Sequence, residues 1–318
     1  MFMSKFLNRL FIYSLAILLI LAMLMYVESR FFKFLPNDYS RHKTIIETLK
    51  NKSLSPEILV FGDSKAMFGV NAKTISNNVK NTPLAFNLSS PAQSASEGSY
   101  FFSKLPTSTK HIIHCIDYSE FSYGILSLEK QVALSMRFYG FEADSLMKEY
   151  IDTLNPVFFE SDLEILYEAR NMLRTALHNE IRKVMDNEPL NENLFHDIYF
   201  PHTYVLNRHP NYPNYPVEFD YNKMNISNEK INFILKIDKF LQKRGIKYHL
   251  IIMPINPDLY QLNNAVHNLN ITKIKELIPK VDIVDLTGFL NNIDFYDGYH
   301  PNKSGAEKLS KEISKHID

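Results

Sequence analysis

The stretch Ile58-Leu59-Val60-Phe61-Gly62-Asp63-Ser64 runs four apolar residues straight into a turn. A short continuous apolar run that ends at glycine is typical of a parallel strand buried on both faces. A serine just beyond such a strand lies at the carboxyl edge of the sheet, where α/β proteins bind their ligands. The stretch therefore predicts an α/β fold, and it makes Ser64 a candidate nucleophile.

The rest of the chain alternates between strand and helix patterns on either side of a long interruption. We expect further strands at 84–88, 111–116, 247–253 and 281–286, after a first one at 57–61. We expect helices at 39–50, 66–79, 97–105, 228–244 and 301–315. This alternation predicts a five-stranded, mostly parallel sheet covered by helices. Residues 125–227 form a large helical insertion, which we expect to cap the edge that carries Ser64.

Composition and charge narrow the class of protein. The 318 residues contain 35 basic and 35 acidic side chains, so nothing predicts the basic face of a nucleic-acid-binding protein. Cys115 is the only cysteine, which excludes an intramolecular disulfide and a cysteine-based zinc site. It lies in an apolar stretch, and we expect it to be a small buried hydrophobic residue.

The N-terminus differs from the remainder. Residues 10–27 carry no charge, and as a helix they would extend about 27 Å, enough for a thin hydrocarbon core. Lys5 and Arg9 precede this segment, so the positive-inside rule predicts a cytoplasmic N-terminus. We expect residues 1–35 to be an uncleaved membrane anchor and residues 36–318 to be an extracytoplasmic α/β domain. A cleaved signal peptide is the alternative.

A second motif follows the last expected strand. It reads Asp297-Gly298-Tyr299-His300 and is followed by Pro301. An aspartate and a histidine on one loop at the same sheet edge as Ser64 could provide a base and the group that orients it. Taken singly, each motif has another interpretation. Ser64 could cap a helix, and Asp297 with His300 could hold a metal ion.

Taken together, these residues resemble the SGNH, or GDSL-type, hydrolase superfamily. The resemblance covers residues 57–124 and 228–318. It implies a flavodoxin-like, three-layer α/β/α sandwich that uses neither cofactor nor metal. It also implies that Ser64 is the nucleophile, His300 the base, and Asp297 the residue that orients the imidazole.

The two middle sequence blocks of the family are less well matched. Ala92 is the best match for the family's oxyanion glycine, so the backbone N–H groups of Ala92 and Ser64 are the expected oxyanion donors. Asn87, at the end of the second strand, could add its side-chain amide, or it could simply be a turn residue. Asp117 stands where the family has an asparagine, which leaves one oxyanion donor unaccounted for.

The neighbours of the nucleophile are assigned no catalytic role. We expect Asp63 to accept backbone N–H groups around the turn and Lys65 to be exposed to solvent. Four tyrosines of the insertion could stack on sugar rings, although loop anchoring is the alternative. They are Tyr199, Tyr204, Tyr212 and Tyr215.

An anchored, outward-facing SGNH-like domain is similar to acyltransferase-type proteins of bacterial envelopes. That similarity implies transfer or removal of an O-acyl group, most simply acetyl, on a cell-surface polysaccharide. It also implies a membrane-bound O-acyltransferase as a partner. One alternative is a catalytically silent scaffold that binds glycan or that acyltransferase. Another is a secreted esterase that acts on soluble substrates.

Overall fold

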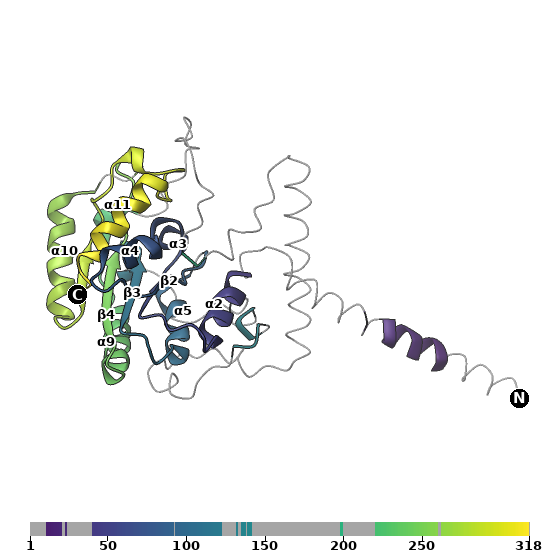
Figure 1. Cartoon of the computed structure of the whole chain (residues 1–318). Coiled ribbons are helices and arrows are strands. Elements are labelled where there is room, and N and C mark those ends of the chain that lie inside the picture. The colour runs from purple at the N-terminus through teal and green to yellow at the C-terminus, as the bar shows by residue number, and fades with distance from the viewer. Residues whose placement is uncertain are drawn as a thin grey trace, which may run out of the picture.

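The computed structural model shows an α/β fold built on a five-stranded, all-parallel sheet (Figure 1). The predicted fold class and parallel sheet are thereby confirmed. The structure describes residues 11–20, 23, 40–91, 93–122, 132, 135–137, 139–141, 198–199, 220–259 and 262–317. Most of the expected insertion, with Tyr204, Tyr212 and Tyr215, lies outside these residues, as does Ala92.

The strands follow one another in the order β2-β1-β3-β4-β5, and each neighbouring pair is parallel. They span Ile58–Phe61 (β1), Ala85–Asn87 (β2), His111–Ile116 (β3), Lys247–Ile252 (β4) and Asp282–Asp285 (β5). The first strand, β1, is an interior strand of the sheet. The next strand, β2, pairs with one side of β1, and β3 pairs with the other side. The loops after β1 and β3 therefore diverge, and such a switch point is where α/β sheets form their ligand sites.

Helices cover both faces of the sheet, because the side chains of β1 alternate between two separate cores. Leu59 and Phe61 belong to the larger core, whereas Ile58 and Val60 belong to the smaller one. The larger core receives α2 (Ser40–Lys50), α5 (Ala95–Tyr100), α9 (Asn228–Lys243) and α10 (Asn264–Leu277). The smaller core receives α3 (Ser64–Gly69), α4 (Ala72–Asn78) and α11 (Lys303–Ser314). Short 3₁₀ turns lie at Phe101–Lys104 (η1), Tyr118–Phe121 (η2), Tyr221–Lys223 (η4) and Asn292–Asp294 (η5).

The helices differ from the prediction at two places in the chain. The single helix expected at 66–79 is two helices, α3 and α4, separated at Val70 and Asn71. Asn71 has an extended backbone and its side chain accepts from Thr74 N at 3.0 Å, so it starts a new helix. The sequence interpretation missed α10, whose buried apolar face is narrow. Asn263 caps α10 by accepting from the backbone N–H groups of its first turn.

The described residues of the insertion contact the rest of the domain at several points. Ser227 N, at the end of the insertion, donates to Phe121 O of η2 at 2.8 Å. Within the insertion, Ile198 O accepts from Asn87 N at 2.7 Å, and Tyr199 O accepts from Ala72 N at 2.9 Å. The insertion therefore returns to the edge strand β2.

Part of the expected anchor is described as a helix over residues 11–20 with exposed apolar side chains. Among the residues that the structure describes, no helix combines the length and the hydropathy needed to cross a membrane.

Candidate active site

The turn after β1 places Ser64 through very close packing. Gly62 N donates to the Gln93 side chain at 2.8 Å, and Gly62 O accepts from Ser90 N at 3.0 Å. A Cβ atom on Gly62 would lie 2.6 Å from the backbone oxygen of Cys115. Only glycine leaves room there, so the β1 turn can lie directly against β3. Cys115 is buried, as predicted.

Asp63 caps the helix that begins with Ser64. Its carboxylate accepts from Lys65 N at 2.9 Å and from Ala66 N at 3.3 Å, which confirms the structural role predicted for it. Burial raises the pKa of Asp63 above its ordinary value, against the opposing effect of the Lys65 charge. Two of the three N–H groups of the first turn are thus occupied. That of Ser64 has no acceptor among the described residues.

The second motif folds into a closed turn between η5 and α11. Tyr296 N donates to His300 O at 2.8 Å, and Gly298 takes a positive φ of 95° that suits glycine. One oxygen of Asp297 accepts from Tyr299 N at 3.0 Å and from His300 N at 2.9 Å. These hydrogen bonds lie within the turn itself, so they fix the position of Asp297 relative to His300 without help from the rest of the site.

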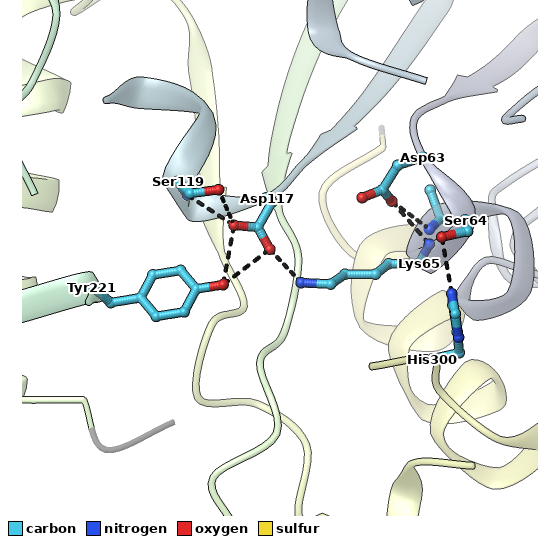
Figure 2. A network of polar contacts seen from close by, with 8 residues as sticks. Asp63, Ser64, Lys65, Asp117, Ser119, Tyr221 and His300 are labelled. Carbon is cyan, nitrogen blue, oxygen red and sulfur yellow. Dashed lines mark hydrogen bonds and ion pairs between the residues drawn. The ribbon is translucent and has the colours of Figure 1, made fainter. Parts of the chain in front are cut away.

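The turn brings His300 to Ser64, from which it is separated by 236 residues. His300 Nε2 lies 2.9 Å from Ser64 Oγ, a contact drawn in Figure 2. His300 Nδ1 lies 2.7 Å from the second oxygen of Asp297. Burial alone would raise the pKa of Asp297, but the hydrogen bonds from His300 and Tyr299 lower it below its ordinary value. The ionised carboxylate keeps the ring proton on Nδ1, so Nε2 accepts from the serine hydroxyl.

Helix α3 also supports the histidine from the side. The rings of Phe68 and His300 pack edge to face, with their centroids 5.2 Å apart. Asn71 N, just beyond α3, donates to Ser310 Oγ of α11 at 2.7 Å. Helix α3, which begins with Ser64, is therefore fastened to α11, which follows His300.

Asn87 does not direct its amide toward Ser64. Its nitrogen donates to Ala66 O at 3.0 Å and to Val70 O at 2.7 Å, while its oxygen accepts from Ser89 N at 3.0 Å. Both amide hydrogens therefore satisfy carbonyl groups of α3 and its C-cap. Asn87 holds this helix against β2, and the interpretation as a turn residue describes it better than that of an oxyanion donor.

The prediction that Lys65 is exposed is wrong. Only 8% of the residue is accessible, and its ammonium group pairs with Asp117 at the end of β3 (Figure 2). Burial would lower the pKa of Lys65, but the Asp117 and Asp63 carboxylates raise it above its ordinary value. Burial would raise the pKa of Asp117, but Lys65 and Ser119 lower it. Both groups are therefore charged.

Comparison with known proteins adds no family to this description. No protein-family model matches the chain, and no curated protein sequence matches it. Within the described ranges, no group of three or more histidine, cysteine, aspartate or glutamate side chains is placed to hold a metal ion.

Proposed function

We propose that this protein is a serine-dependent acyltransferase or esterase of the SGNH superfamily. The observation that carries the proposal is the unbroken chain of hydrogen bonds Asp297–His300–Ser64, at 2.7 and 2.9 Å. A hydroxyl, an imidazole and a carboxylate in this order form a proton relay for acyl transfer.

In the proposed reaction, Ser64 Oγ attacks an acyl carbonyl while His300 Nε2 takes the hydroxyl proton. Asp297 stabilises the imidazolium that forms. The leaving alcohol then departs with the proton from His300, and an acyl-serine remains. Water or a sugar hydroxyl attacks this ester with His300 as the base, which releases either a free acid or an acylated sugar. The Ser64 N–H, together with that of Ala92, would stabilise the oxyanion.

Two further features support membership of this superfamily. The strand order β2-β1-β3-β4-β5 is that of flavodoxin-like sheets. The loop with Ser64 follows β1, and the loop with His300 follows β5, so both come from the carboxyl edge of the sheet. A flavodoxin-like, three-layer arrangement is accordingly part of the proposal.

The proposed substrate is an O-acyl group, most simply acetyl, on a cell-envelope polysaccharide. This choice depends on the uncharged segment 10–27, which we propose anchors an outward-facing domain in a membrane. A membrane-bound O-acyltransferase is the proposed partner and acyl donor. If Ser64 proves unreactive, a scaffold that binds glycan or this acyltransferase becomes the better proposal.

A fluorophosphonate probe tests the nucleophile. We expect it to label the detergent-solubilised full chain and to fail on Ser64→Ala. Ser53→Ala, a change of the same kind at an exposed serine, should label like wild type. Labelling that survives Ser64→Ala would reject Ser64 as the nucleophile. An unlabelled wild type that also fails to hydrolyse p-nitrophenyl acetate would reject the proposed activity.

A second assay separates transfer from hydrolysis. The protein is given an acetyl donor and an unacylated glycan acceptor, and both products are measured. Acylated glycan in excess of free acetate identifies a transferase, and the reverse identifies an esterase.

A further inference from the structure

A buried ion pair lies directly beside the proposed nucleophile and has no part in the proton relay. Lys65 is the residue after Ser64, and its side chain reaches from α3 to Asp117 at the end of β3 (Figure 2). The side chains are 10% and 14% exposed, so water screens them little. Removing two charges from water is costly, and such a pair at a site invites a functional explanation.

The pair matters electrostatically because negative charge develops at this edge during acyl transfer. The ionised Asp117 accepts hydrogen bonds but donates none, so it cannot stabilise an oxyanion. On its own, its charge would oppose the tetrahedral intermediate on Ser64. The Lys65 ammonium cancels that charge. It also retains two hydrogens that have no acceptor among the described residues.

The pair also connects three parts of the molecule. Asp117 accepts from Ser119 N at 2.8 Å and from Ser119 Oγ at 2.6 Å, which fixes the carboxylate above η2. The Tyr221 hydroxyl, from η4 at the C-terminal end of the insertion, lies 3.2 Å from the same carboxylate oxygen. Lys65 therefore joins the first turn of α3 to the end of β3 and to the base of the insertion.

We propose that Lys65 and Asp117 form a positioning pair for the acyl-transfer site. Lys65 neutralises Asp117 and holds the first turn of α3, so that the Asp117 charge is compensated where Ser64 faces His300. The pair takes the place of the asparagine that SGNH enzymes carry after the third strand. This inference rests on the proposed function, since it concerns the rate at which Ser64 is acylated.

A double-mutant cycle tests the proposal. The variants are Lys65→Met, Asp117→Asn and the double variant, compared with the full-length wild type in p-nitrophenyl acetate hydrolysis and fluorophosphonate labelling. We expect Lys65→Met to lower kcat by roughly 100-fold with a smaller change in KM, because Asp117 is left uncompensated. The double variant lacks both charges of the pair, so no uncompensated Asp117 remains, and it should recover to within about tenfold of wild type.

The recovery is the decisive result against a direct Lys65 donor, which no change at Asp117 would replace. A purely structural pair is distinguished by the thermal melts, because in that case Lys65→Met would lose stability and kcat together. A double variant that folds but is as slow as Lys65→Met overturns the proposal, and so does a Lys65→Met variant with wild-type kcat. If Lys65→Met fails to fold, as judged by its thermal melt, the double variant is compared with wild type alone. A kcat more than tenfold below wild type then overturns the proposal.

A matched control is the pair Lys110–Glu57, at 2.5 Å, which lies before β3 and β1 at the opposite edge of the sheet. Lys110→Met with Glu57→Gln should leave kcat unchanged. A wild-type chain that reacts with neither reagent overturns the proposed function together with this inference. If the wild type reacts with these reagents but the Lys65→Met and Asp117→Asn changes have independent effects on kcat, this inference alone is overturned.

Discussion

At the scale of single residues, Asp297 determines which nitrogen of His300 is free for the serine. Its two oxygens receive three hydrogen bonds from Tyr299 and His300, and the one from Nδ1 orients the ring. An amide at this position could instead donate to Nδ1 and place the ring proton on Nε2.

We therefore expect Asp297→Asn to lower kcat by about 10³- to 10⁴-fold while the chain stays folded. The check is p-nitrophenyl acetate hydrolysis together with a thermal melt of each protein. A loss smaller than tenfold would mean that the imidazole is oriented by something other than Asp297.

Gly69 lets α3 approach the loop that carries His300. A Cβ atom at this position would lie 2.8 Å from Pro301 Cγ and 3.3 Å from a methyl carbon of Leu309. Pro301 follows His300 directly, so pressure on the proline moves the imidazole.

Gly69→Ala should accordingly lower kcat/KM at least tenfold through a longer Ser64–His300 distance. Gly288→Ala is the matched control, because no atom lies within 4 Å of the added carbon there. The check is kcat/KM for p-nitrophenyl acetate, measured on both variants and on wild type. Equal activity would show that the loop adapts without moving His300.

At the scale of elements, the end of β5 is joined to α10 by one carboxylate. Asp285 accepts from His267 Nε2 at 2.8 Å and from the Thr287 hydroxyl at 2.6 Å. Burial would raise the pKa of Asp285, but these hydrogen bonds lower it below its ordinary 3.8. A carboxyl whose pKa is lowered by folding stabilises the fold above its unfolded pKa. That contribution is lost as the pH falls through the folded value.

Asp285→Asn should then lower the free energy of unfolding by about 1–3 kcal/mol at pH 7. The difference from wild type should shrink as the pH falls from 3.8 toward the lower folded pKa, because the unfolded carboxyl is protonated first in this range. Urea unfolding at pH 7, 5 and 3.5 measures this. A difference that stays constant over the three pH values would contradict the assignment.

At the scale of the whole molecule, the smaller core beneath α11 holds Ser64 and His300 at their observed separation. Leu309 is completely buried in the smaller core, where a methyl carbon lies beside Gly69 of α3. This core connects the beginning of the α/β domain with its end, and it fixes the separation of the two halves of the relay.

Leu309→Ala should lower the free energy of unfolding by about 2–5 kcal/mol, because it leaves a cavity under both halves. Leu269→Ala, at a position that is 69% exposed, is the matched control and should change stability by less than about 0.5 kcal/mol. Urea titrations of the two variants and wild type measure these free energies of unfolding. Similar losses in both would mean that α11 contributes little to the core.

The sequence alone was sufficient for the fold class, the five strands and the meeting of Ser64 with Asp297 and His300. These features are local or repetitive. An apolar run that ends at Gly62 marks a buried strand, and parallel strands bring their carboxyl ends to one edge. The last helix was also predicted, and Asn302 caps it by accepting from Gly305 N at 3.0 Å.

Only the tertiary structure decided how the polar neighbours of Ser64 are used. Lys65 resembles a surface lysine until Asp117, 52 residues away, proves to be its partner. Asn87 has amide hydrogens that any nearby acceptor could take, and the carbonyl groups of α3 take them. The physical reason is that burial and hydrogen-bond partners depend on segments that meet in space, and a local pattern does not specify which segments those are.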